Sequence, residues 1–231
     1  LLIDVGATTM DICGFNLHER QGDDQYAQFT SDVRDDLGAF ELHKFRVDQL
    51  RKHFQDEKLA SIADSIDPLM MIPDSVKGYL RANPTDNEEL NLVKIDDVFV
   101  DKCRKAVRRI LMYLKSKRYR CSPRWREGLP VFITGGGSRL QLYHRALDRA
   151  DESLRGETFS AGLQVKRLPK PRSLANDDLS DEDFLFLTVA YGLSHSHNEI
   201  GDIRPPSGIQ DDEPPLEPPD WGSRYVDKDQ V

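Results

Sequence analysis

Short apolar runs separated by polar turns open the chain, and this pattern is typical of β-strands. The runs span residues 1–3, 12–17 and 26–30. Two later segments, the β-prone run 129–133 and the alternating run 163–168, predict two further strands. Five strands are therefore expected, three of them consecutive at the start of the chain.

Apolar residues at helical spacing predict helices between these strands and after the last one. Gly38 and Ala39 form a small-residue corner before the first helix, which fits a close approach of chain and sheet. In the first helix, Phe40, Phe45, Leu50 and Phe54 recur at roughly helical spacing, with charged residues between them. A longer helix follows from Asp97, with the apolar stripe Val100, Cys103, Val107, Ile110, Leu111 and Leu114. Ser180 caps a last helix, and Gly192 within it predicts close packing against the sheet.

Basic residues cover the other faces of the longer helix. A helix of this charge could contact nucleic acid or an acidic partner. However, aromatic residues are not interleaved as stacking platforms would require. Asp96, Asp97 and Asp101 lie at its predicted N-terminal end, where the helix dipole favours acids. A solvated face is the favoured interpretation.

Composition narrows the function classes. The chain is 38% hydrophobic and 31% charged, and its formal charge is -8. This charge argues against a general nucleic-acid or anionic-membrane binder. No apolar stretch reaches the length of a bilayer span, and no signal-peptide pattern is present. Cys13, Cys103 and Cys121 are unpaired in sequence and fit a reducing compartment, so we expect a cytoplasmic protein.

The turn between the first two predicted strands carries the first candidate chemistry. Asp4 and Asp11 flank it. Small and hydroxyl residues fill it: Gly6, Ala7, Thr8 and Thr9. Backbone N–H groups of such a turn can hold phosphate oxygens. Two carboxylates beside a phosphate repel it unless a cation lies between them, so the acids predict a hydrated Mg²⁺. A plain polar hairpin turn is the alternative.

A second turn combines a strand, three glycines and a helix. The run 129–134 ends at Gly135, Gly136 and Gly137, and Ser138 and Arg139 follow. This arrangement brings backbone amides and a positive helix end to a ligand. It is neither a Walker A loop nor a GxGxxG motif. A tight turn without a ligand is again the alternative.

Three stretches in this order resemble the ATPase superfamily of actin and the heat-shock chaperones. Residues 4–11 (DVGATTMD) resemble its second phosphate loop, D-x-G-x-x-T-x-D, and 133–139 (ITGGGSR) resemble its adenosine motif. Residues 188–193 (TVAYGL) are similar to the closing helix of the chaperones' nucleotide-binding domain, and Leu-Gly-Ala at 37–39 lies where they have Leu-Gly-Gly. The family's first phosphate loop has a similar pattern. If residues 4–11 were the first phosphate loop, a second phosphate loop would follow before the adenosine motif. No such loop is present between Asp11 and Gly135.

The resemblance therefore implies the second lobe of such an ATPase. Its fold class would be α/β, a ribonuclease H-like lobe with a mixed five-stranded sheet flanked by helices. Residues 1–37 and 129–200 would form the nucleotide-binding sheet subdomain, and 38–128 a mainly helical inserted subdomain. Residues 201–231 are acidic and proline-rich and predict a flexible tail. The chain begins with Leu inside a predicted strand, so we expect it to be a fragment of a longer protein.

The family's residue roles transfer to matching positions. The residues implied to contact the β- and γ-phosphates of ATP or ADP are Gly6, Ala7, Thr8 and Thr9. Asp4 would hold Mg²⁺ through water, and Asp11 would lie near the attacking water or the metal, so Asp4, Thr9 and Asp11 are the catalytic candidates. The nucleoside contacts would be Gly135, Gly136, Gly137 and Ser138, with Arg139 against the adenine face. Ala7 and Thr8 replace glycines that are usual in the chaperones.

The implied function is Mg-ATP binding and hydrolysis that drives opening and closing of two lobes. This chain would supply at most half of the catalytic site, with the first lobe of the same protein as its partner. Other protein partners or clients are expected beside the nucleotide. An actin-like filament protein and a nucleotide sensor with little hydrolysis are the alternatives.

Overall fold

The computed structural model describes most of the chain outside two long stretches. The described ranges are 1–20, 23–53, 92–118, 122–155, 160–172, 174, 179–200 and 202–204. Residues 54–91 of the predicted inserted subdomain and residues 205–231 of the predicted tail lie outside them. The predicted boundaries of the inserted subdomain and the nature of the tail therefore stay predictions.

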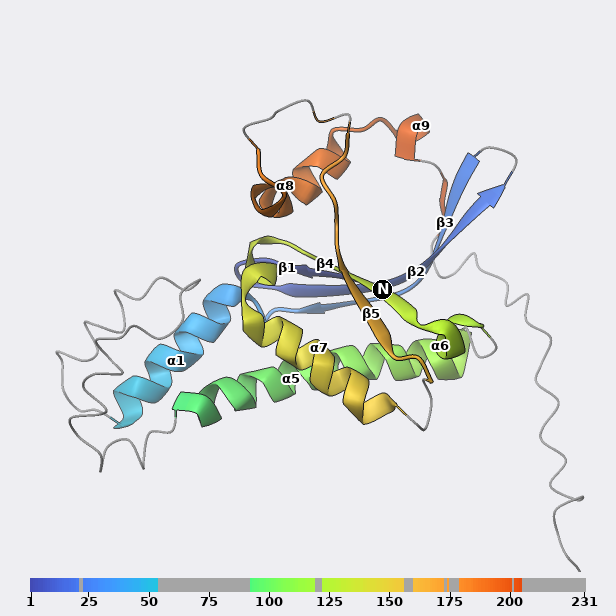
Figure 1. The fold of residues 1–231 in the computed structure, drawn as a ribbon. Helices are drawn as coiled ribbons and strands as arrows, with labels where there is room; N and C mark the ends of the chain where they lie inside the picture. Colours follow the sequence, from blue (N-terminus) through green and yellow to red (C-terminus); the bar gives the residue numbers. More distant parts are fainter. Residues whose placement is uncertain are drawn as a thin grey trace, which may run out of the picture.

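A mixed, open sheet forms the centre of an α/β fold (Figure 1). Its strand order across the described residues is β5-β4-β1-β2-β3-β6. The strands are β1 Leu2–Val5, β2 Met10–Arg20, β3 Asp23–Arg34, β4 Leu129–Thr134, β5 Leu163–Arg167 and β6 Asp202–Arg204. β2 pairs antiparallel with both β1 and β3, and the other neighbours are parallel. All five predicted strands are confirmed.

The prediction of a five-stranded sheet is nevertheless short by one strand. β6 comes from residues assigned to the tail, and it pairs in parallel with β3 at Gln25, Tyr26 and Ala27. Three residues with one apolar position carry no periodic signal. Backbone pairing with β3, rather than composition, makes this segment a strand.

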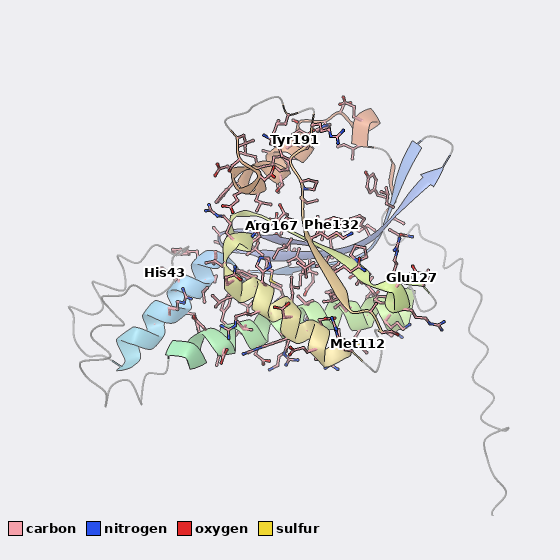
Figure 2. All side chains as sticks on the ribbon, viewed as in Figure 1. His43, Met112, Glu127, Phe132, Arg167 and Tyr191 are labelled. Atoms are coloured by element: carbon pink, nitrogen blue, oxygen red, sulfur yellow. The ribbon has the colours of Figure 1, made fainter. Side chains whose placement is uncertain are left out.

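Helices lie on both sides of the sheet. α5 and α7 cover one face, and α8 and α9 lie on the other side (Figure 1). Met112 of α5 and Tyr191 of α8 mark these two sides (Figure 2). The α-helices are α1 Ala39–His53, α5 Leu92–Tyr113, α6 Arg124–Glu127, α7 Gln141–Leu154, α8 Asp181–Leu193 and α9 His197–Ile200. A π-helix, η1 Leu114–Arg118, extends α5, and a 3-10 helix, η2 Gly136–Arg139, precedes α7. None of the described helices has the length and apolar composition of a membrane span.

The hydrophobic core lies between the sheet and the α5–α7 layer. Alternate residues of β1 and β4 point into it: Ile3, Val5, Val131 and Ile133 are buried. Every residue of the predicted apolar stripe, which runs along α5 to Leu114 at the start of η1, is buried in the same cluster, and this confirms the stripe. The described part of residues 38–128 thus shares its core with the sheet.

The acids of α5 have partners that the sequence did not predict. α5 begins at Leu92, so Asp96, Asp97 and Asp101 lie inside the helix, after its first turn. An interaction with the helix dipole requires acids in the first turn and therefore does not explain them. Asp96 pairs with Arg46 of α1 in two bonds of 2.8 and 2.9 Å. Asp97 accepts from Arg145 and Arg149 of α7, and Asp101 pairs within α5. The acids therefore neutralise arginines and lysines around them and tie α5 to its neighbours.

α8 is apolar on nearly all sides but only partly covered. Ser180 caps it as predicted, because its hydroxyl accepts from the Asp183 N–H. Phe184 and Leu185 are buried, whereas four large apolar side chains are exposed: Phe186, Leu187, Val189 and Leu193. The prediction that Gly192 packs closely on the sheet is wrong. Among the described residues, an added Cβ at Gly192 would meet no atom within 4 Å outside its own helix, so Gly192 is exposed although it lies one turn after Thr188.

Candidate functional site

The two candidate turns meet at one edge of the sheet. β1 and β4 are parallel neighbours, with Asp4 in register with Thr134. Their carboxyl ends therefore lie side by side, and each end leads into one of the turns. Gly135, at φ +81°, lies so close that an added Cβ would be 2.3 Å from Asp4 Oδ1 and 2.4 Å from the Val5 carbonyl oxygen. Residues far apart in sequence thus lie side by side, as the resemblance implied for Asp4 and the glycine turn.

The first turn is fixed from outside by the start of α1. Gly6 N–H donates to the Thr9 carbonyl at 2.9 Å and closes the turn. The carbonyl oxygens of residues 6–8 then accept hydrogen bonds from the N–H groups of Gly38 and of the first residues of α1. These bonds run from Ala39 N to Gly6 O (3.0 Å), from Phe40 N to Ala7 O (2.6 Å) and from Gly38 N to Thr8 O (3.2 Å). N–H groups of a helix start that lack helical partners are satisfied here by the turn.

Gly38 makes this contact possible. An added Cβ at Gly38 would lie 2.2 Å from the Thr8 carbonyl carbon and 2.4 Å from the Ala7 oxygen. The corner itself is held by Tyr143 of α7, whose hydroxyl donates to the Leu37 carbonyl at 2.8 Å. Burial raises the pKa of Tyr143, so this hydroxyl stays a donor. The expected close approach at Gly38 is confirmed, and its partner is the candidate turn.

The three hydrogen bonds from residues 38–40 to the carbonyls of the first turn, which we call the clamp, determine the direction of the turn's N–H groups. In a planar trans peptide, a carbonyl and the following N–H point in opposite directions. The carbonyls of residues 6–8 point to the start of α1, so the N–H groups of Ala7, Thr8 and Thr9 point away from it. Among the described residues, no backbone or side-chain acceptor takes any of these three N–H groups. Three successive free donors on the outer side of an exposed turn suit phosphate oxygens.

Two carboxylates lie at the base of this turn. Asp4 and Asp11 are directly opposite in the β1–β2 pairing, so their side chains leave the same face of the sheet. Asp11 accepts from the Thr9 hydroxyl at 3.1 Å. Burial raises the pKa of Asp4, and the charge of Asp11 raises it further, with no offsetting cation among the described residues. The described residues contain no group of three or more acids, histidines or cysteines placed so that they could hold a metal ion. Two acids alone fit a cation that keeps most of its water.

The second turn is more compact than the sequence suggested. Gly137 and Ser138 are buried, and an added Cβ at Gly137 would lie 2.4 Å from Val5. The Ser138 hydroxyl donates to the Gly135 carbonyl at 2.6 Å. The Ser138 carbonyl lies 2.9 Å from His144 Nε2. These two residues therefore support the turn. Gly135 is buried as well, against Asp4 and Val5, and of the three glycines only Gly136 is partly exposed.

α8 contributes residues that the motif analysis missed. The Thr188 hydroxyl lies 2.7 Å from that of Thr134, at the end of β4. Phe186 packs on Gly136, where an added Cβ would be 2.4 Å from Cε1 of its ring. The Arg139 guanidinium carbon is 5.7 Å from the centre of the same ring, within cation–π range. The sequence did give a signal for this helix, since residues 188–193 resemble the chaperones' closing helix, but that signal did not indicate which side chains of α8 contact the turn.

Comparisons with known proteins add no family assignment. The chain matches no protein-family model, and no curated protein matches it. The chemistry of the site therefore has to be argued from its own geometry.

Proposed function

We propose that this chain is the ATP-binding lobe of a heat-shock-chaperone-like ATPase, in which Mg-ATP binding and hydrolysis drive opening and closing of two lobes. The first turn carries the proposal. Its three free N–H groups face outward, its carbonyls are held by α1, and a glycine turn from β4 lies against its base. A turn that only joined two strands would need neither this second turn nor paired acids.

Each element of the site has a chemical task in this proposal. The N–H groups of Ala7, Thr8 and Thr9 hold the β- and γ-phosphate oxygens. Gly135 lets the glycine turn lie directly against Asp4, because a side chain there would collide with that carboxylate. The nucleoside would then pass along the partly exposed Gly136. Asp4 and Asp11 hold hydrated Mg²⁺, which neutralises phosphate charge and fixes the β- and γ-oxygens when bound.

Asp11 is the residue best placed to orient water for hydrolysis. Its hydrogen bond from Thr9 fixes one carboxylate oxygen, and the other remains for a water molecule. Phosphoryl transfer of this kind depends on positioning and charge neutralisation, and it needs no covalent intermediate on the protein. Residues of the first lobe complete the site, so we expect the present chain to bind nucleotide and to hydrolyse it slowly at most.

Titration of the 231-residue chain with ATP tests the proposal. We expect binding that requires Mg²⁺ and disappears with a chelator. Asp4→Asn removes one charge without changing side-chain shape and should weaken Mg-ATP binding at least tenfold. Asp148→Asn is the matched control, because Asp148 is an exposed acid on α7 outside the site. The proposal is wrong if the wild-type chain binds no Mg-ATP, or if both variants bind it as the wild type does.

A further inference from the structure

Phe186 is an aromatic residue whose position is not explained by packing in the core. Its side chain is 47% exposed, although it follows two buried residues of α8. Its ring edge rests on Gly136, and the Arg139 guanidinium lies over the ring at 5.7 Å. Large aromatic residues at the surface usually mark a contact site when polar groups adjoin them.

The neighbourhood of Phe186 is continuous with the candidate phosphate site. Gly135 touches Asp4 at the base of the first turn, and the next residue, Gly136, touches Phe186. A ligand whose phosphates lie on the first turn and whose nucleoside follows the glycine turn would therefore reach this ring. Glu182, at 3.6 Å, holds the guanidinium of Arg139 beside it.

The ring and the guanidinium have one chemical property in common. Both are flat, and flat groups bind the π-face of a nucleobase by stacking. Because the guanidinium lies over one face of the ring, the base would stack on the opposite face of the ring or on the outer face of the guanidinium. Stacking contacts the face of the base and makes no hydrogen bond to its edge. It therefore contributes to the affinity for any purine nucleotide, without separating adenine from guanine.

We propose that Phe186, together with Arg139, forms a stacking platform for the purine base of the bound nucleotide. The inference rests on the proposed function, because it needs the phosphates on the first turn. It adds a residue from α8 to a site otherwise built from the two turns. Specificity for adenine, in this arrangement, comes from other groups.

The test compares ligands with and without a base. The 231-residue chain is titrated with Mg-ATP, Mg-GTP and magnesium tripolyphosphate, as wild type and as Phe186→Ala, Phe186→Trp and Leu193→Ala. Phe186→Ala should weaken both nucleotides about tenfold and leave tripolyphosphate unchanged. Phe186→Trp keeps a flat ring, so it should retain nucleotide affinity, and its added fluorescence should respond to nucleotides and not to tripolyphosphate. Leu193 is 81% exposed on the same helix and has no contact with the turn, so Leu193→Ala should bind all three as the wild type does.

Three results would overturn the platform, and each has its own meaning. If the wild type binds Mg-ATP and Phe186→Ala binds it equally well, the ring does not contact the base and the proposed function stands. If Phe186→Ala binds nucleotides more tightly, the ring occupies the place of the base. If the wild type binds neither nucleotide nor tripolyphosphate, the proposed function and the platform are both wrong.

Discussion

The contact between Gly38 and the first turn gives the sharpest prediction for mutagenesis. Gly38→Ala adds one methyl group against backbone atoms that cannot rotate away: the Thr8 carbonyl carbon at 2.2 Å, the Ala7 oxygen at 2.4 Å and the Thr8 Cα at 2.6 Å. The φ of Gly38 lies outside the range that only glycine favours, so alanine meets no intrinsic backbone penalty there. The whole effect must come from the collision.

The loss of folding free energy in Gly38→Ala follows from the steric overlap and from the hydrogen bonds that the turn would lose. Ordinary van der Waals contact requires a shift of about 1 Å or more between turn and helix, which the three hydrogen bonds at 2.6, 3.0 and 3.2 Å do not survive together. Overpacking costs roughly 1–3 kcal/mol, and each lost hydrogen bond costs about 0.5–1.5 kcal/mol. Since the turn is exposed and water replaces some of these bonds, we expect about 2–4 kcal/mol of destabilisation.

Urea unfolding followed by circular dichroism measures this change, with Gly192→Ala as the matched control. Gly192 has no neighbour within 4 Å of an added Cβ, so alanine there should be neutral or stabilise α8 by roughly 0.5–1 kcal/mol. Gly38→Ala should also lose Mg-ATP binding, because the N–H groups no longer point outward. Equal urea midpoints for Gly38→Ala and the wild type would refute the clamp between α1 and the turn, whatever the nucleotide result.

Three further predictions concern charges and hydroxyls around the site. Asp4→Asn should stabilise the protein by roughly 0.2–1 kcal/mol while weakening Mg-ATP binding, because it removes a like charge opposite another acid. Since the folded pKa of Asp4 is raised, wild-type stability should fall as pH rises from the ordinary value, 3.8, through the raised one, and urea midpoints of Asp4→Asn should lack this component. Arg46→Met should lower the free energy of unfolding by roughly 3–5 kcal/mol, because it leaves the carboxylate of Asp96 poorly solvated and unpaired. In a double-mutant cycle, Asp96→Leu in the same chain should restore most of this stability. Thr134→Val should cost about 0.5–1.5 kcal/mol in thermal melts. Thr188→Val should cost at least as much, because the Thr188 hydroxyl also donates to the Leu185 carbonyl at 3.2 Å.

Local patterns predicted most of the elements, because alternation and helical spacing reflect which side of a segment is buried. The strands at the start of the chain, the apolar stripe of α5 and the Ser180 cap were all predictable in this way. β6 was not, since three residues carry no period and only pairing with β3 defines them. Periodicity also placed the start of α5 too late, which led to the wrong explanation of its acids.

Local sequence likewise predicted one part of the candidate site, and tertiary structure decided the other. The sequence by itself determined two small-residue turns, the acids flanking the first of them, and the strands that end in both turns, because these depend only on neighbouring residues. Tertiary structure decided that Gly38 clamps the first turn, that Ser138 turns inward and that Phe186 covers Gly136. It also decided that Gly192 has no close packing partner on the sheet. The contacts of Gly38 and Phe186 join segments from different elements, and their distances depend on strand register and helix placement, which no local pattern encodes.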